Sequence, residues 1–292
     1  MYDLHRLRLL RELSHRETLA AVAEALGYSP SAISHQLGLL ERETGTRLLE
    51  PSGRRVRLTA AAVQLVAHTE TILRELERAE ADIAASRTTI TGTVHIATFQ
   101  TAAQTLVLDV IQRLALHHPR LTVTFAHVDA EAAIPALIAR DYDLVLSEQY
   151  PGNPQAPHPG VSSERVLDDP LLLAIPAGWS ARTLADLAEK PWVMERPGTA
   201  ARAWSTATCR AAGYEPEVPY ETSDLNLHSE IVDSGLAAAF LPRLAYAPSR
   251  SFRTVSTDQL RIITASTRSG GDRNPAVNAF RRALKQATAA PR

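Results

Sequence analysis

A predicted helix within residues 29–41, SPSAISHQLGLLE, carries an unusual set of polar side chains. Ser31, Ser34, His35 and Gly38 fall on one face of this helix, because they are spaced three and four residues apart. Hydroxyl and imidazole groups both donate and accept hydrogen bonds, and short side chains let another molecule approach closely. A face exposed only to water usually carries Glu and Lys. This face is instead suited to hydrogen bonding with base edges in the major groove of DNA.

The other side of the same helix is apolar. Ile33, Leu37 and Leu40 recur at i, i+4 and i+7 and predict a buried stripe. Ser29 stands where an N-cap is expected, and Pro30 occupies the first helical position, where its missing N–H does no harm.

A shorter helix is predicted immediately upstream. Thr18 precedes LAAVAEALG, and Gly27 at its end suits a left-handed C-terminal conformation. Two helices joined by so short a turn, the second with an apolar inner face, predict a helix-turn-helix. An ordinary helical hairpin buried in a core is the alternative interpretation.

A basic turn and strand follow, SGRRVRLT at residues 52–59, which predict the wing of a winged helix-turn-helix. Residues 1–59 contain nine arginines, one Asp and six Glu, a formal charge of +2, whereas the whole chain has −1. This small local excess predicts salt-sensitive binding to double-stranded DNA and argues against indiscriminate coating of nucleic acid. The predicted DNA contacts are Thr18, Pro30, Ser31, Ser34, His35, Arg54, Arg55 and Arg57.

Residues 60–86 contain no Gly or Pro and predict one long helix. An apolar seam repeats over three heptads, which is the spacing of a two-stranded coiled coil. Its members are Ala62, Leu65, Thr69, Ile72, Leu76, Ala79 and Ile83. We therefore expect a dimerising linker helix; packing of the helix on its own chain is the alternative.

The remainder of the chain alternates strand and helix patterns. Strand-like runs at 94–98, 121–128 and 143–147 are separated by helical patterns at about 101–118 and 130–140. This order predicts a parallel sheet. After a loop rich in Pro and Gly, a second set follows: PLLLAIP, PWVME, a helix at about 199–212, VPYETS, a helix at about 224–234, AAAFLP, LRIITAS and a terminal helix.

Composition and missing motifs narrow the function classes. With 45% hydrophobic and 22% charged residues the chain is typical of a globular protein. Its single cysteine, Cys209, excludes a cysteine-rich metal site or a disulfide framework and fits a reducing compartment. We find no GxGxxG, phosphate loop, GxSxG or HExxH motif, and no apolar stretch long enough to span a membrane. We therefore expect no enzyme activity, no metal site, no cofactor and no membrane association.

The order of these elements resembles the LysR-type transcriptional regulators over essentially the whole chain, most specifically within residues 18–62. The family pattern at the recognition helix is Ser-Gln-Pro-Ala-x-Ser-x-Gln. Ser29, Ala32, Ser34 and Gln36 match it, whereas Pro30 and Ser31 stand where the pattern has Gln and Pro, and His35 replaces a common Arg.

The resemblance implies an α/β fold class with an N-terminal all-α winged helix-turn-helix, a long linker helix and a periplasmic-binding-protein-like effector domain of two α/β subdomains. The expected domains are 1–59 for DNA binding, 60–86 for dimerisation, 91–161 with 266–292 for effector subdomain I, and 162–265 for effector subdomain II. It also implies a cytoplasmic bacterial regulator that forms a homodimer through the linker helix and a homotetramer through its effector domains.

By the same resemblance, a small-molecule effector binds between the two subdomains. The expected ligand-contacting residues are Thr98, Gln100, Thr101, Glu148, Arg196, Thr199, Arg202, Thr222 and Asp224. Arg196 and Arg202 favour a small organic anion or an amino acid. A second interpretation is a small-molecule sensing protein whose N-terminal helical domain mediates assembly and not DNA binding.

Overall fold

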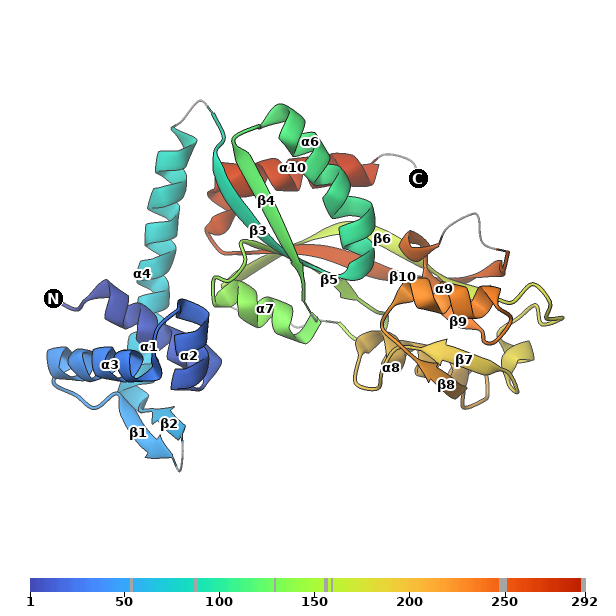
Figure 1. Cartoon of the computed structure of the whole chain (residues 1–292), viewed down its shortest axis with the longest axis horizontal. Coiled ribbons are helices and arrows are strands. Elements are labelled where there is room, and N and C mark those ends of the chain that lie inside the picture. Colours follow the sequence, from blue (N-terminus) through green and yellow to red (C-terminus); the bar gives the residue numbers. More distant parts are fainter. Residues whose placement is uncertain are drawn as a thin grey trace. The chain divides into compact units, whose positions relative to one another are not determined.

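The computed structural model describes residues 1–292 except 53–54, 87–88, 129, 155–156, 159, 247–250 and 290–292 (Figure 1). The side chains of Arg55, Glu131 and Asp272 also lie outside the description. Contacts divide the chain into two compact units. The first comprises residues 1–88, 138–141 and 269–275, and the second comprises residues 89–137, 142–268 and 276–292. Among the described residues, no helix is both long enough and apolar enough to cross a membrane.

The first unit is a helical domain with a small β-hairpin. Its elements are α1 (Leu4–Arg16), α2 (Leu19–Leu26), α3 (Pro30–Thr44), β1 (Leu49–Ser52), β2 (Arg55–Leu58) and α4 (Ala60–Ala85). The caps expected from the sequence are present. The hydroxyls of Thr18, Ser29 and Thr59 accept hydrogen bonds from backbone N–H groups at 3.1, 3.2 and 3.2 Å, at the starts of α2, α3 and α4. Gly27 ends α2 with φ +71°, a conformation that a side chain would disfavour.

The apolar stripe of α3 is buried, as its spacing predicts. Ile33, Leu37 and Leu40 are at most 1% exposed and pack with leucines of α1 such as Leu10 and with Val22 of α2. Truncating one such side chain typically lowers the free energy of unfolding by about 2–5 kcal/mol. Because rotating α3 about its axis would expose the whole stripe, burial of the stripe holds the helix in one rotational position. The rotation determines which side chains α3 presents outward.

A buried ion-pair cluster joins α1 to α4. Arg11 is only 1% exposed, and its guanidinium pairs with Glu12 and Glu70, each at 2.6 Å. Glu70 also lies 3.1 Å from the His15 ring. Desolvation would raise the pKa of Glu70, but hydrogen bonds from His15 and Arg11 lower it to about 2. Glu70 therefore keeps its negative charge over the whole neutral range, and its pairs with Arg11 and His15 fix α1 on the long helix α4.

Helix α4 buries only part of the predicted seam. Ala62 and Thr69 are fully buried within the first unit, so here the alternative interpretation, packing on the same chain, is right. Farther along, Ile72, Leu76 and Ile83 are 46%, 41% and 63% exposed. The apolar surface of α4 thus has a buried side, which also includes Leu73 and Ala81, and an exposed stripe formed by Ile72, Leu76 and Ile83.

The second unit is built on one six-stranded sheet in the order β4-β3-β5-β10-β6-β9. Its strands are β3 (Gly92–Thr98), β4 (Leu121–His127), β5 (Leu144–Gln149), β6 (Val161–Ile175), β9 (Ala239–Pro242) and β10 (Arg253–Arg268). β3 pairs in parallel with β4 and β5, as the strand-helix-strand pattern predicts. β10 pairs antiparallel with β5 and β6. A separate parallel pair consists of β7 (Pro191–Met194) and β8 (Glu217–Glu221).

Helices cover the strands of this unit (Figure 1). They are α5 (Gln100–Ala102), the π-helical turn η1 (Ala103–Val107), α6 (Leu108–His117), α7 (Ala130–Ile138), α8 (Ala200–Ala211), α9 (Leu225–Asp233) and α10 (Pro275–Ala289). Short 3₁₀ turns lie at η2 (Ala185–Leu187), η3 (Arg243–Ala245) and η4 (Gly271–Arg273). Side chains of α6 and α10 share one core with one face of β3 and β5, and side chains of α7 pack on the other face.

Strands β6 and β10 extend well beyond the apolar segments PLLLAIP and LRIITAS that predict them. The first half of β6 is mostly exposed or half-buried and lacks apolar alternation, which explains why the sequence pattern shows only the second half. Because each long strand takes part in cores at both ends of the sheet, the two halves of the unit share a continuous backbone framework. The predicted fold class, a winged helix-turn-helix followed by a linker helix and α/β subdomains, is confirmed.

Candidate functional site

The outward face of α3 carries the polar side chains that the sequence singles out. Ser31, Ser34 and His35 are exposed. The Oγ atoms of Ser29 and Ser31 lie 3.0 Å apart, at the start of the helix. These groups are anchored by the buried stripe behind them and remain free to exchange hydrogen bonds with another molecule.

Two of the predicted contact residues have a clear structural role at helix starts. Thr18 is half-buried, and its Oγ1 accepts a hydrogen bond from the backbone N–H of Ala21. Pro30 is exposed at the first position of α3. Both residues therefore fix where a helix begins, beside the positive end of its dipole.

The wing is a hairpin in which Glu50 pairs with Arg57 across β1 and β2. The Arg57 guanidinium lies 3.1 Å from the Glu50 carboxylate and is 75% exposed. An exposed pair of this kind contributes about 0–1 kcal/mol, so a phosphate can compete for the guanidinium. Arg54 lies outside the described residues, as does the side chain of Arg55.

The second unit contains a cleft of about 1040 Å³, a volume suited to a small organic molecule. Five of the predicted ligand-contacting residues line it, namely Gln100, Thr101, Glu148, Arg196 and Thr199. They come from the start of α5, the end of β5 and the loop before α8, which are segments distant in sequence. The expected convergence of these segments is therefore present.

Thr98, Arg202, Thr222 and Asp224 are not among the lining residues. Thr98 is 1% exposed at the end of β3. The Arg202 guanidinium is engaged elsewhere, donating to the backbone oxygen of Glu195 at 2.8 Å and to Glu221 at 2.9 Å. The two-arginine anion site expected from Arg196 and Arg202 is therefore not formed in this structure.

Thr222 and Asp224 flank the cleft, which is lined by Ser223 between them. The Thr222 hydroxyl accepts a hydrogen bond from the Asp224 N–H at 3.1 Å. Asp224 in turn accepts a hydrogen bond from the Gln100 side chain at 2.8 Å. Gln100 also accepts one from the N–H of Leu225 at 3.2 Å, so it joins the start of α5 to the start of α9. These contacts connect the two sides of the cleft.

Arg261 is a lining residue of the cleft that the sequence analysis missed. It is 1% exposed and lines the cavity from β10. Its guanidinium donates to Asp169 at 2.7 and 2.8 Å, to Thr101 Oγ1 at 2.7 Å, and to Glu148. The Phe99 ring lies 5.3 Å from it. Burial alone would lower the pKa of Arg261, but the charges of Glu148, Tyr150 and Asp169 raise it.

A sequence signal for Arg261 exists. It is the one charged residue in the apolar segment LRIITAS, and a charge within a buried strand requires partners. The partners Asp169 and Glu148 lie 92 and 113 residues away in sequence, so the pattern cannot name them.

Glu195 is a second lining residue that sequence analysis missed. Desolvation and the nearby charge of Glu148 raise the pKa of Glu195 to about 7, against the opposing effects of Thr199, Arg261 and Arg196. Tyr150, also in the lining, is 5% exposed, and burial raises the pKa of its phenol well above the usual value. Glu195 therefore titrates near neutral pH at the wall of the cleft.

Both parts of the chain match known sequence families. The family described as "LysR substrate binding domain" matches residues 87–289, and that described as "Bacterial regulatory helix-turn-helix protein, lysR family" matches residues 4–63. The transcriptional dual regulator GltC of Bacillus subtilis is 26% identical over 84% of this chain and 82% of its own length. The DNA-binding transcriptional dual regulator OxyR of Escherichia coli is 26% identical over 85% of this chain and 81% of its own length.

Solved structures share the fold. A full-length OxyR variant from Pseudomonas aeruginosa aligns with a TM-score of 0.71 at 20% identity, covering 98% of this chain and 95% of that one. Full-length CbnR in complex with its target DNA aligns with a TM-score of 0.52 at 23% identity, covering 97% of this chain and 100% of that one. At these identities the likeness concerns the fold.

The buried network predicts a strong effect of removing Arg261. Arg261→Gln leaves Asp169, itself 1% exposed, without a cation, and should lower the free energy of unfolding by about 3–5 kcal/mol. Tryptophan fluorescence during urea unfolding measures this loss, because Trp179, Trp192 and Trp204 all lie in the second unit.

The matched control is Arg210→Gln. Arg210 and its partner Glu215 are 64% and 63% exposed, so this change should leave the free energy of unfolding nearly unchanged. Equal losses for the two variants would contradict a special role of the buried network.

Proposed function

Because this chain belongs to the LysR family of bacterial regulatory proteins and is a DNA-binding transcriptional regulator, we propose that a small effector in the 1040 Å³ cleft controls DNA binding by α3 and the wing. One observation carries the proposal: the chain combines an exposed Ser and His face on a rigidly packed helix with a large cleft built around a buried arginine. The protein would act in the cytoplasm, where the bacterial chromosome is. The matching relatives are regulators, and we assign no catalytic step to this chain.

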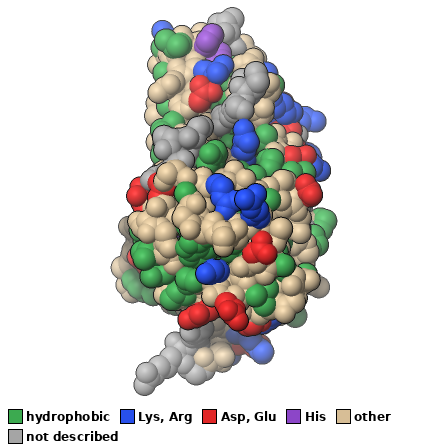
Figure 2. Space-filling view, turned by 90° about the vertical axis from the view of Figure 1, so that its right-hand side faces the viewer, with side chains coloured by type: hydrophobic (Ala, Val, Ile, Leu, Met, Phe, Trp, Pro, Cys, Tyr) green, Lys and Arg blue, Asp and Glu red, His purple; other side chains and the backbone are tan. Residues whose placement is uncertain are grey.

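We assign base contacts to Ser31, Ser34 and His35 and phosphate contacts to the wing arginines Arg54, Arg55 and Arg57. Thr18 and Pro30 would contact the backbone near the helix starts, where N–H groups and the helix dipole attract phosphate. Acidic and basic side chains are interspersed on the face of the protein shown in Figure 2, and neither sign covers it. Apart from the atoms drawn in grey, this face therefore shows no broad basic surface for DNA.

Base and phosphate contacts differ in their expected mutational effects. Ser34→Ala or His35→Ala should weaken binding to the specific site about 5- to 100-fold, since a good base contact is worth about 1–3 kcal/mol, and should leave random DNA nearly unchanged. Arg57→Ala should weaken both and reduce the salt slope by about one. Fluorescence anisotropy with DNA from upstream of the gene and with shuffled DNA measures both quantities.

Arg120→Ala, at an exposed arginine of the second unit, is the matched control and should change neither affinity. If Ser34→Ala loses the same affinity for specific and for shuffled DNA, Ser34 does not contact bases. If Arg57→Ala binds DNA with wild-type affinity at every salt concentration, the wing does not contact phosphate through Arg57.

We propose that α4 pairs two copies of the chain through its exposed apolar stripe. Ile72, Leu76 and Ile83 follow one another at steps of four and seven residues and stay exposed within the chain, so a second helix would bury them. A dimer presents two recognition helices to successive major grooves of a pseudo-palindromic site. Further pairing of effector units would yield the tetramer typical of the family.

The double variant Ile72→Asp, Leu76→Asp should halve the mass of the assembly, from tetramer to dimer or from dimer to monomer, because burying two carboxylates in the seam is unfavourable. Light scattering coupled to size exclusion measures the mass of the 31.8 kDa chain and its multiples. Gln64→Asp places a carboxylate at an exposed polar position of the same helix and should leave the dimer intact. An unchanged mass of the double variant would place the interface elsewhere.

The effector we propose is a small organic anion or an amino acid. Arg196 is exposed in the loop before α8 and lines the cleft together with Gly198 and Thr199, at the N-terminus of that helix. A carboxylate at this end of the cleft would meet a guanidinium and backbone N–H groups. Arg202, bound to Glu221, contributes no ligand contact in this proposal.

Some relatives are named hydrogen peroxide-inducible genes activators, which raises peroxide sensing as a second candidate. A peroxide-sensing cysteine needs an accessible thiolate. Cys209 is the only cysteine, is fully buried in α8, and burial raises its pKa to about 11. We therefore propose that the signal is a bound effector and not oxidation of Cys209.

The burial of Cys209 leads to a simple chemical test. Ellman's reagent should titrate no thiol in the native protein and one thiol per chain in urea, and Cys209→Ala should retain wild-type DNA binding with and without peroxide. Rapid labelling of the native protein, or a peroxide effect on DNA binding that Cys209→Ala abolishes, would instead favour redox sensing.

A further inference from the structure

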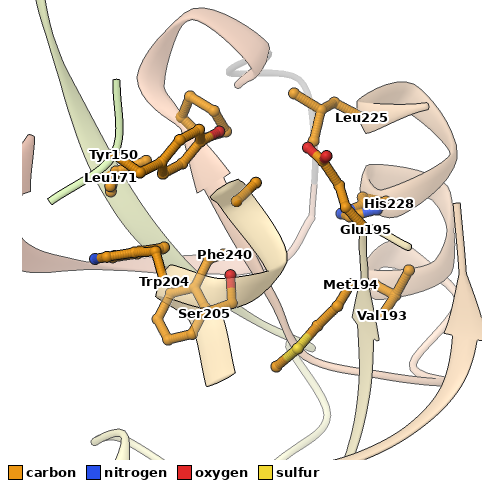
Figure 3. A pocket seen from close by; sticks show the side chains of 12 residues that line it. Tyr150, Leu171, Val193, Met194, Glu195, Trp204, Ser205, Leu225, His228 and Phe240 are labelled. Carbon is orange, nitrogen blue, oxygen red and sulfur yellow. The ribbon is translucent and has the colours of Figure 1, made fainter. Parts of the chain in front are cut away.

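A small cavity of about 20 Å³ adjoins the cleft and shares four of its lining residues, Tyr150, Glu195, Ala201 and Leu225. This volume accommodates one water-sized group, because a single water requires about 10–15 Å³ by the same kind of measure. Figure 3 shows Glu195 and His228 on one side of the cavity and Tyr150 and Trp204 on the other. The cavity therefore forms a deep end of the cleft with a polar side and an aromatic side.

We propose that this cavity binds a primary ammonium group of the effector, held between Glu195, His228 and the aromatic rings. The proposal rests on the proposed function, since it assigns a chemical group to the ligand of the same cleft. An ammonium site would distinguish the two effector classes considered above, because an amino acid or another amine carries an ammonium group and a simple organic anion does not.

The charge balance around Arg261 favours a cation. Glu148 and Asp169 both pair with the single guanidinium of Arg261. Within the described part of the chain, no basic side chain forms an ion pair with Glu195. The carboxylates of Glu148, Asp169 and Glu195 thus face two guanidiniums, those of Arg261 and Arg196, and a bound ammonium would offset the remaining negative charge when Glu195 is ionised.

His228 provides a second acceptor for the ammonium group. His228 is 2% exposed, and its Nε2 lies 2.8 Å from the backbone oxygen of Thr222. The ring is therefore protonated at Nε2, and this N–H donates a hydrogen bond to the Thr222 carbonyl. Its Nδ1 is therefore a lone-pair acceptor, and it is buried without a hydrogen-bond partner. Burial lowers the pKa of His228, which keeps the ring neutral. A buried unpaired acceptor in the lining of the cavity calls for a donor from the ligand.

The aromatic side of the cavity also suits a cation. The Trp204 ring lies 5.9 Å from Tyr150 and 4.8 Å from Phe240 between centroids, and all three residues line the cavity. Aromatic faces attract ammonium groups electrostatically. Because the cavity has room for only one water-sized group, a primary ammonium fits, whereas a trimethylammonium group does not.

The charged and titratable groups that face Glu195 come from several elements. They are Glu148 at the end of β5, Tyr150 just after it, Arg261 of β10 and Arg196 of the loop before α8. His228 of α9 lines the same cavity. Of the groups here whose pKa is shifted, only Glu195 has a pKa near neutral pH, at about 7. An ammonium should therefore bind more tightly as pH rises from 6 to 8, because Glu195 ionises while an alkylamine stays protonated.

The test compares four probes on the full chain: 1-butylammonium, 1-butanol, butyrate and trimethylbutylammonium. Each is titrated to about 100 mM at constant ionic strength while the melting temperature is recorded, since binding to the native state raises it. We expect a saturable rise for 1-butylammonium, and none for 1-butanol or trimethylbutylammonium. Its Kd should be about tenfold lower at pH 8 than at pH 6, following the ionised fraction of a group with a pKa of about 7.

Glu195→Gln keeps the shape of the side chain and removes the buried charge, so it should fold and should lose both the 1-butylammonium effect and its pH dependence. Glu189→Gln removes an exposed carboxylate and is the matched control, which should behave as wild type. Glu189→Gln should bind DNA as wild type without a probe. Glu195→Gln should unfold in urea with a cooperative change in tryptophan fluorescence, which establishes that the second unit is folded.

Three results would overturn the ammonium site: no binding of 1-butylammonium, equal binding of 1-butanol, or undiminished 1-butylammonium binding by Glu195→Gln. The proposed function has its own readout in the same experiment. A butyrate-induced rise that Arg196→Ala abolishes would keep the cleft as the effector site while excluding the ammonium group.

Discussion

The fully buried guanidinium of Arg261 is the interaction around which the second unit is organised. A charge removed from water is unfavourable unless hydrogen-bonded counter-ions surround it. Here the counter-ions and acceptors come from β5, β6 and the start of α5, so one side chain constrains three elements. Replacing Arg261 by an apolar residue without replacing its partners would leave buried carboxylates unpaired. The same arrangement leaves polar groups in the lining of the cleft, where a ligand can exchange hydrogen bonds with them.

Because Glu148 and Thr101 contact both Arg261 and the cleft, a ligand that binds there acts on the network that joins the two halves of the unit. The bridge from Gln100 to Asp224 and Leu225 lies beside it. An effector can shift the equilibrium between an open and a closed cleft only by binding one state more tightly than the other. Contacts that exist only when both sides of the cleft meet the ligand provide such a difference in affinity.

The first unit exposes the polar side chains of α3 on a helix whose rotation is restrained by packing. Ile33, Leu37 and Leu40 hold α3 against α1 and α2, and capping hydroxyls satisfy the N–H groups at the helix starts. Arg11 and Glu70 then attach this domain to α4, whose exposed stripe is available for a second chain. Local sequence and buried charge thus act together to present the Ser and His face in one orientation.

The sequence by itself determined the helical part almost completely. Caps, apolar spacing and the Gly27 terminus are local signals, and they correctly place α2, α3 and the start of α4. They also indicate the strand and helix order of the second unit, and five of the nine residues expected at the cleft line it. These features depend on neighbours within a few turns of chain, which is why spacing reveals them.

Only the tertiary structure decided the roles of charged residues whose partners are remote. Arg261 and Glu195 line the cleft because strands distant in sequence meet there, and Arg202 is absent from the lining because Glu221 and a backbone oxygen bind it. It also divided the linker seam into a buried half and an exposed half. Burial and long-range pairing depend on the packed arrangement of the whole unit, and a residue's type and local spacing carry no information about either.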